Sequence, residues 1–536
     1  MAPANRNNPY RFEPFLEWRE QLDYYASDGF LQRVVRHFAG AGFARVDAAA
    51  RELSRSVSFR WRDMANAIAI PERRPFLVHW DAHHNRVDRI VRPAETETME
   101  REVFSQGLFS SSTDLITRLT KLYLIYENGE ACIACPLVCT EGMVAVLEGL
   151  ADRAETRAIL EHVKEGRGGE FGIGAQFLSE IQGGSDVPAN LVEAVEEDGA
   201  WRLHGTKFFC SVAHADYAVV TAKPRGAESL GLFITPCWLP GQKGKRRNGL
   251  TIDRLKWKMG TAELPTAEVT FEGAVAYPLG ALDRGLANVV GTVLTLSRLT
   301  VGLASAAYMT RAAREAAGYA RFREVFGQKI SDFPMAQAQL DDMAHTARRT
   351  TAGGFKTYRL FYEAGGLSRS PDPSLPARRR TFDARELVML QKFVASEDCT
   401  DVIHEAMGVF GGNGIVEDFS SLPRLFRDSS VNELWEGPRN VLQAQIHRDL
   451  QRAASWYPPS EFVASLLAGG DPVAVAALSR EVSEIVSRPS LLARDASTVA
   501  ACRRWDAACR DLMHAFQDIA LREVEASTTI PSEEAS

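Results

Sequence analysis

The first third of the chain carries apolar residues at helical spacing. In 31–38, 115–126 and 143–150 the apolar positions recur with the period that places them on one face of a helix. The first of these segments follows a serine and an aspartate at 27–28, which are typical of a helix start. We therefore predict that residues 1–170 form a mainly helical N-terminal domain.

Between 171 and 280 the apolar positions alternate with polar ones, as they do in strands. Alternating runs at 192–196 and 201–205 flank Asp198-Gly199, a pair that favours the tight turn of a β-hairpin. Further alternating runs follow before residue 280. We predict a compact antiparallel β domain over 171–280.

Helical spacing returns after the β domain. The long segments 286–322, 334–364 and 381–409 predict a C-terminal helical domain over 281–450. Residues 451–536 add further helical segments and end in a polar tail, which we expect to be disordered. The chain is thus predicted to have helical parts on both sides of one β domain.

Composition and charge exclude several classes of protein. The 536 residues are 45% hydrophobic, which is enough for a large core, and the net charge of −7 argues against a protein that coats nucleic acid with its whole surface. No apolar run approaches the roughly 20 residues of a membrane-spanning helix, and the N-terminus lacks an apolar signal core. We therefore expect a cytoplasmic protein without a membrane segment.

The eight cysteines do not form a disulfide framework or a recognisable metal site. Cys132, Cys135 and Cys139 form a cluster, but a zinc or iron–sulfur site would need a fourth ligand and polar surroundings. Their neighbours are apolar, so we interpret the three as small buried residues. No metal site is predicted.

Two segments of the β domain contain residues suited to a flat ligand. Residues 179–186 include paired glycines, which let a ligand approach the main chain, although an ordinary turn would also explain them. Phe209 and Ser211 are two apart in a predicted strand, so their side chains share a face and could together contact a cofactor. The alternative is an aromatic residue of the core.

Two further segments follow in the C-terminal helical domain. The glycines of Gly411–Gly414 permit close approach to a phosphate or ribose, whereas a helix C-cap would need one glycine. Glu436 stands between Trp435 and Gly437, and burial beside the aromatic ring would raise its pKa toward the range useful for proton abstraction. The alternative is an exposed carboxylate at the start of a helix.

In this order and spacing the segments resemble the acyl-CoA dehydrogenase family of flavoproteins, over about 15–450. The matching motifs are Ser179-Glu180, Gly184-Ser185-Asp186, Gly205-Thr206-Lys207-Phe208-Phe209, Arg323-Glu324-Val325-Phe326-Gly327, Gly411–Gly414, Arg427-Asp428 and Trp435-Glu436-Gly437. Residues 182–187, Phe209 where tryptophan is common, and Trp435 before the glutamate make the chain most similar to the AidB-like branch. The resemblance implies an α+β fold with an N-terminal helical domain, a middle antiparallel β-barrel and a C-terminal four-helix-type bundle plus a helical extension.

The resemblance also implies a cofactor, FAD, bound between the β domain and the C-terminal helices of a homotetramer. The residues that match cofactor-binding positions are Gln176, Ser179, Ser185, Phe209, Ser211, Arg323, Phe326, Gly411, Gly412, Trp435, Gly437 and Asn440. Of these, Arg323 and Phe326 match a segment that reaches the FAD of a neighbouring subunit. Arg298 matches a residue of the acyl-CoA site.

Glu436 matches the catalytic base of the family. In the implied reaction it removes the α proton of an acyl thioester while hydride leaves the β carbon for the flavin, which gives a trans-2-enoyl thioester. Four positions depart from the pattern of the family. Pro334 after Phe333 and Gly408 each stand where the family has a glutamine, Thr295 stands for an aspartate, and Pro438 stands for a threonine or serine. These replacements leave open the acyl group and whether CoA or a carrier protein holds it. The electron acceptor, an electron-transfer flavoprotein or oxygen, is open as well.

Two other functions fit the sequence less well. An oxygen-using flavin enzyme with a specialised substrate would explain the replaced positions, but the retained Glu436 favours dehydrogenation. An AidB-like DNA-binding protein of the alkylation response would need clustered basic residues. Residues 451–536 contain 8 basic and 12 acidic residues, and the basic runs 243–247 and 378–380 are typical of solvated loops. Nucleic acid is therefore the less favoured partner.

Overall fold

The computed structural model describes residues 10–366 and 374–527, so the polar tail from 528 onward lies outside the described residues. The N-terminal part is mainly helical, as predicted. Its helix α2 begins after Asp28, whose carboxylate accepts hydrogen bonds from the N–H groups of Phe30 and Leu31. The N-terminal helices are α1 (Glu13–Glu20), α2 (Gly29–Ala39), α3 (Phe43–Arg55), α4 (Arg62–Ile68), α5 (Ala94–Phe104), α6 (Leu115–Tyr126), α7 (Ala134–Leu150) and α8 (Ala154–Lys164).

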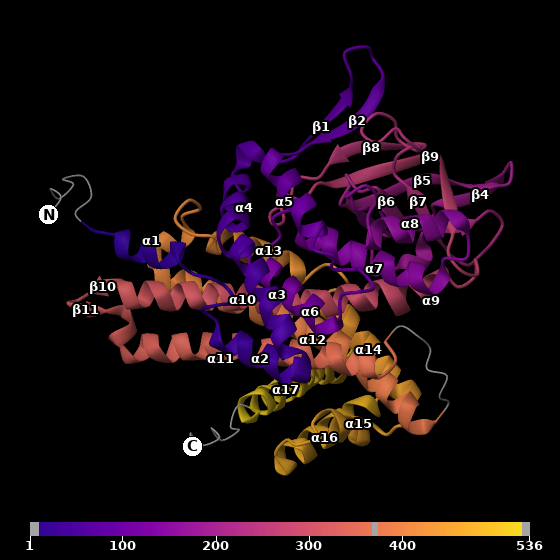
Figure 1. Cartoon of the computed structure of the whole chain (residues 1–536). Coiled ribbons are helices and arrows are strands. Elements are labelled where there is room, and N and C mark those ends of the chain that lie inside the picture. The colour runs from indigo at the N-terminus through magenta and orange to yellow at the C-terminus, as the bar shows by residue number, and fades with distance from the viewer. Residues whose placement is uncertain (1–9, 367–373, 528–536) are drawn as a thin grey trace.

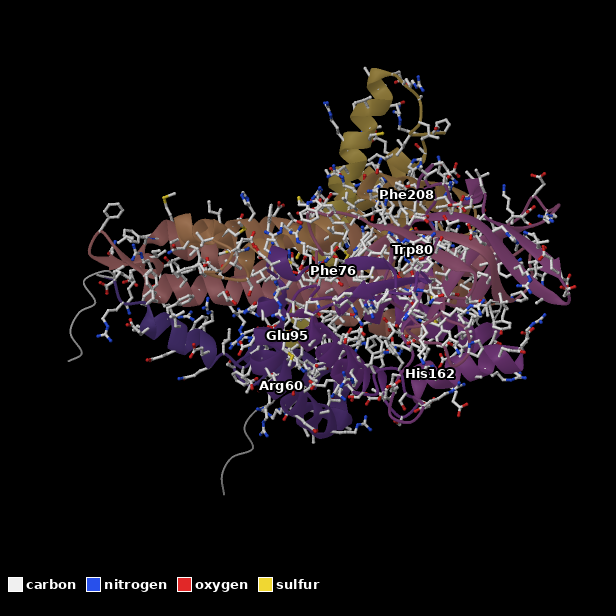
Figure 2. All side chains as sticks on the ribbon, turned by 90° about the horizontal axis from the view of Figure 1, so that it is seen from above. Arg60, Phe76, Trp80, Glu95, His162 and Phe208 are labelled. Carbon is white, nitrogen blue, oxygen red and sulfur yellow. The ribbon has the colours of Figure 1, made fainter. Side chains whose placement is uncertain are left out.

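A β-hairpin interrupts these helices, which the sequence analysis did not predict. Strands β1 (Phe76–Trp80) and β2 (Arg86–Val91) pair antiparallel, and seen from above Phe76 and Trp80 lie over the β domain (Figure 2). Most residues of both strands are exposed or half-buried, so burial imposes little alternation on their sequence. The N–H of Ile252 donates to Asp88 at 3.0 Å and joins the hairpin to the β domain.

The middle domain is a closed β-barrel with two additional strands. The ring consists of β6, β4, β5, β9 and β7 and is closed because β7 pairs with both β9 and β6. Of the two additional strands, β3 pairs with β6 and β8 pairs with β9. The predicted hairpin is confirmed, since Asp198 and Gly199 join β4 to β5 with φ values of 52° and 75°. The strands are β3 (Gly174–Phe177), β4 (Glu193–Glu197), β5 (Ala200–Ser211), β6 (Tyr217–Pro224), β7 (Gly231–Pro236), β8 (Leu250–Leu255) and β9 (Thr266–Pro278).

Two pairings of the β domain are parallel, where the sequence analysis expected antiparallel strands. Both β3 and β4 pair with β6 in the parallel direction. Alternation along a strand tells which face a side chain occupies, but it does not tell the direction of the neighbouring strand.

Long helices form the C-terminal bundle beside the β domain (Figure 1). They are α9 (Gly285–Asn288), α10 (Leu294–Phe322), α11 (Pro334–Glu363), α12 (Leu375–Phe410), α13 (Leu422–Asn432) and α14 (Arg439–Ala453), with a small hairpin of β10 (Glu324–Val325) and β11 (Gln328–Lys329) between α10 and α11. The extension adds α15 (Pro459–Leu466), α16 (Pro472–Val486) and α17 (Ala496–Ala526). Helix α17 packs against α11, and the apolar side chains of α15–α17 share a second core with α12.

One helical stretch is long and apolar enough to cross a membrane, which the sequence analysis did not expect. It runs over Gly285–Phe322, through α9, a π-helical turn and α10. However, 78% of its most apolar window is buried inside the fold, where α10 contacts α7, α11 and α12. We interpret the stretch as the central helix of the bundle.

Candidate active site

Glu436 lies in a turn between α13 and α14. It has a left-handed backbone, with φ of 61°, and the next residue, Gly437, has φ of 100°. Glycine adopts this region freely, but for glutamate it costs free energy and needs support from the surrounding structure. Pro438 then caps α14, and Asn440 is an exposed residue of its first turn.

Two buried cations hold this turn through its main chain. Arg298 on α10 donates from Nε to the carbonyl of Glu436 at 2.9 Å. Lys392 on α12 donates from Nζ to the carbonyls of Glu433 and Gly437, at 3.0 and 2.9 Å. The structure thus places Arg298, which the resemblance assigns to the substrate site, directly against the main chain of the predicted base.

The carboxyl group of Glu436 has a pKa close to neutral pH. Its Oε2 atom is buried and has no hydrogen-bond partner among the described residues, while the residue as a whole is partly exposed. Burial raises the pKa of Glu436 to about 7, and the positive charges of Arg298 and Lys392 oppose that rise. A carboxyl group of this kind can accept a proton at neutral pH and release it again. The neighbouring Trp435 also buries an indole N–H that lacks a partner in the described part of the chain.

The predicted flavin-binding segment, which begins in β3, contacts the helix that holds this turn. Gln176 donates from Nε2 to the hydroxyl of Ser297 at 3.4 Å, and Ser297 precedes Arg298 in α10. Helix α10 therefore connects the predicted flavin loop to Glu436. The structure brings together two segments that are about half the chain apart in sequence.

A buried ion pair anchors the same loop to strand β5. Lys207 donates to Glu180 at 2.7 Å, and Glu180 also accepts the N–H groups of Leu191 and Val192. Burial acts to raise the pKa of Glu180, but Lys207 and these N–H groups hold that pKa below its usual value. The carbonyl of Ser179 accepts the N–H of Phe208, whereas Ser185 farther along the loop is exposed.

Phe209 and Ser211 lie on β5 at a bulge. The pairing with β9 shifts between Lys207 and Cys210, and such a shift changes the direction of nearby side chains. Phe209 is 53% exposed, so the alternative that it is a core residue is wrong. The hydroxyl of Ser211 lies 3.1 Å from that of Thr266.

The remaining predicted cofactor residues lie at the other end of the bundle. The β10–β11 hairpin projects there, away from the β domain (Figure 1). Phe326, at its tip, is 98% exposed, and the guanidinium group of Arg323 lies 4.1 Å from the ring of Tyr10. One chain therefore does not bring Arg323 and Phe326 to Glu436.

The glycines of the 411–414 segment lie in different structural environments. Gly411 is the C-cap of α12, with φ of 60°, as the C-cap alternative expected. At Gly414 a Cβ atom would stand 2.1 Å from the carbonyl oxygen of Met407, so packing requires glycine. At Gly412 no atom of the described chain lies within 4 Å of such a Cβ, which leaves room for a ligand or a second subunit.

Lys392 is the residue of this site that the sequence analysis missed. It is fully buried, although lysine is rarely buried without a partner. The available signal was its position in the apolar run 387–395 of a predicted helix, where a lone lysine must enter the core.

One side-chain cluster has the geometry of a metal site but contains its own counter-ion. Glu100, Cys132 and His214 bring their ligand atoms within 4.8 Å of one another. Arg92, however, donates to both oxygens of Glu100, at 2.7 and 3.0 Å, and His214 lies 2.7 Å from the same carboxylate. We interpret the cluster as a buried ion-pair network.

The two basic runs are partly neutralised within the chain. Lys243 of the first run lies 2.7 Å from Asp216, and Arg379 of the second lies 2.7 Å from Glu461. Charges that are paired in this way contribute less to phosphate binding.

Comparison with known proteins identifies the family. The family models described as "Acyl-CoA dehydrogenase, C-terminal domain" and "Acyl-CoA dehydrogenase, middle domain" match residues 283–451 and 175–274, together about half of the chain. Acyl-CoA dehydrogenase family member 11 of Caenorhabditis elegans is 29% identical over 82% of this chain and 70% of its own. The putative acyl-CoA dehydrogenase AidB of Escherichia coli K12 is 29% identical over 81% and 79%.

The fold comparison agrees. The crystal structure of Caenorhabditis elegans ACDH-11 in complex with C11-CoA superposes with a TM-score of 0.77 at 24% identity, over 94% of this chain and 90% of that one. The family models and this shared fold support the predicted α+β architecture, and the AidB relative supports the AidB-like resemblance. The chain belongs to the acyl-CoA dehydrogenase family and is AidB-like.

Proposed function

We propose that this chain catalyses the FAD-dependent α,β-dehydrogenation of an acyl-CoA or a related acyl thioester, with Glu436 as the general base. Family members are oxidoreductases that act on CH–CH bonds, and the ACDH-11 structure contains an acyl-CoA. The observation that carries the proposal is the carboxyl group of Glu436. Its Oε2 atom is buried and unpartnered among the described residues, its turn is held by Arg298 and Lys392, and its pKa is about 7.

The residues at the predicted cofactor positions fit FAD, which proteins of this family bind. Phe209 presents an exposed aromatic ring beside Ser211, and Gly412 leaves open space at the bundle end. We propose that Gln176, Ser179, Ser185, Phe209, Ser211, Trp435, Gly437 and Asn440 hold the flavin end. Bound FAD would accept the hydride that leaves the β carbon of the substrate.

The chain itself supplies the proton acceptor. The α C–H bond of a thioester is acidified by the adjacent carbonyl, and Oε2 of Glu436 takes the proton as the β C–H bond loses hydride. The substrate thus loses one proton and one hydride and becomes a trans-2-enoyl thioester. Burial of Oε2 removes water from that oxygen, and burial raises the pKa of Glu436 to about 7.

We expect a second copy of the chain to complete the cofactor site. Arg323 and Phe326 lie too far along the bundle to reach the flavin end of their own chain (Figure 1), and the 98% exposed ring of Phe326 is accessible to another subunit. Phe326→Asp should weaken the proposed tetramer and reduce FAD retention. Sedimentation velocity with flavin absorbance measures both.

Leu492→Asp, which changes another strongly exposed apolar residue away from this hairpin, is the matched control. An intact, fully FAD-loaded Phe326→Asp tetramer would contradict this expectation.

Anaerobic titration of the FAD-loaded protein with a panel of acyl-CoA thioesters tests the proposed reaction. Substrates with α and β hydrogens should bleach the oxidised-flavin absorption, and the chain length that does so most readily identifies the acyl class. Pivaloyl-CoA, which has no α hydrogen, is the control that should leave the flavin oxidised. Failure of every acyl-CoA to bleach a bound flavin would contradict the proposal.

A further inference from the structure

Lys392 is buried in the bundle for a reason that packing does not explain. Its exposed fraction is 0%, and it follows the buried Gln391 on α12 in a segment that also contains the buried apolar residues Leu390 and Phe393. Removing an ammonium group from water costs several kcal/mol unless hydrogen bonds and charges compensate. The compensation comes from the turn that carries Glu436.

The contacts of Lys392 bracket Glu436 along the chain. Nζ donates to the carbonyl of Glu433, directly after α13, and to the carbonyl of Gly437. A cation near a helix C-terminus is favoured by the dipole of the helix. Arg298 contacts the carbonyl of Glu436 between these two points. Three carbonyls of one turn are thus fixed by cations from two different helices.

We propose that Lys392 is a positioning residue for the base, because it holds residues 433–437 with Glu436 in its left-handed conformation and places a positive charge beside its carboxyl group. This inference rests on the proposed function of Glu436. Its structural part, the restraint of the turn, concerns the chain alone and can be measured without turnover.

The effect of the Lys392 charge on Glu436 depends on the other charged groups around these two residues. Lys392 interacts with the charges of Arg298 from α10, Glu433 from the turn and Glu397 from α12. Behind these lie Glu386 of α12, which interacts with Arg298, and Arg439 of α14 and Arg510 of α17, which pair with Glu397. Arg385 pairs with Glu386, and Arg439 and Arg510 pair with Glu397, so these carboxylates are already engaged. Burial lowers the pKa of Lys392 to about 7, and Glu436 opposes that fall.

The pKa of Glu436 depends on its burial and on both cations. Burial raises the pKa of Glu436, and Arg298 and then Lys392 lower it again. A general base acts when deprotonated, so the rate of flavin reduction should rise with pH through about 7 in the natural protein. Removing the charge of Lys392 should raise the pKa of Glu436 and move this rise to higher pH, by about one unit.

Three variants of Lys392 separate its two roles in the FAD-loaded protein. Lys392→Met removes both the charge and the donors, Lys392→Gln removes the charge but keeps a donor, and Lys392→Arg keeps both. Lys356→Met is the matched control, because Lys356 is also largely buried but pairs with Glu523, between α11 and α17. The readouts are the pH profile of flavin reduction by an acyl-CoA and amide hydrogen exchange of 433–442.

We expect Lys392→Met to shift the pH profile upward and to speed exchange of the turn at least tenfold. Lys392→Gln should give the same pH shift with a smaller change in exchange. Lys392→Arg keeps its charge above pH 7, where Lys392 loses its own, so it should leave the exchange unchanged and should not move the pH profile upward. Lys356→Met should change neither readout. If the methionine variant does not fold, the glutamine variant still tests the charge. A natural pH profile and natural exchange in a folded Lys392→Met or Lys392→Gln protein would overturn the inference. If the natural protein does not react with any acyl-CoA, the proposed function fails instead, and the exchange data still decide whether Lys392 holds the turn.

Discussion

The variant Glu436→Gln should bind FAD but be reduced by an acyl-CoA about 10⁴-fold more slowly than the natural protein, the upper end of what removal of a general base costs. Glutamine has nearly the shape of glutamate and cannot accept the α proton. The contacts that hold the turn go to main-chain carbonyls, so the substitution preserves them. Stopped-flow absorption of the oxidised flavin under anaerobic conditions measures the rate.

Glu433→Gln is the informative comparison, because it changes the other carboxylate of the same turn. Its rate should fall less than about tenfold, since its carboxyl group is not the proton acceptor in the proposed reaction. Equal losses in the two variants would show that the turn, rather than the carboxyl group of Glu436, matters. A Glu436→Gln protein with the natural rate would exclude Glu436 as the base.

The second large effect is expected at the buried ion pair of Lys207 and Glu180, which anchors the predicted flavin loop to β5. Lys207→Met should lower the free energy of unfolding by about 3–5 kcal/mol, because it leaves the buried carboxylate of Glu180 without its counter-charge. Lys207 also donates to the carbonyl of Leu178 and the hydroxyl of Thr221, at 3.1 and 3.2 Å, so its loss removes two further hydrogen bonds, while Asn190 still donates to both acceptors. Urea unfolding measures the stability, and the fluorescence of released flavin measures FAD retention, which should fall as well.

A double variant tests the cause of this loss. Adding Glu180→Gln to Lys207→Met removes the orphaned charge and keeps an acceptor oxygen for one of the two N–H groups, that of Leu191 or that of Val192. The double variant should therefore be more stable than Lys207→Met alone. Lys356→Met breaks a more exposed ion pair and should cost about 1 kcal/mol or less. A Lys207→Met protein as stable as this control would refute the role of the buried pair.

The local parts of the fold were predictable because local patterns determine them. The helix start at Asp28, the hairpin at Asp198-Gly199 and the long bundle helices each depend on neighbouring residues. The β1–β2 hairpin was missed because its half-buried strands carry a weak alternation. The parallel pairing of β3 and β4 with β6 was missed because alternation carries no information on strand direction.

The sequence by itself determined the order of the helical and β parts, the resemblance to the acyl-CoA dehydrogenase family and the choice of Glu436 as the candidate base. The tertiary structure alone decided what surrounds that base. Gln176 meets α10 beside Arg298, and Lys392 reaches the turn from α12, although these residues are far apart in sequence. A pKa depends on burial and on charges in space, and a strained backbone depends on the contacts that restrain it. Both are properties of packed helices, which the spacing of residues along one chain does not reveal.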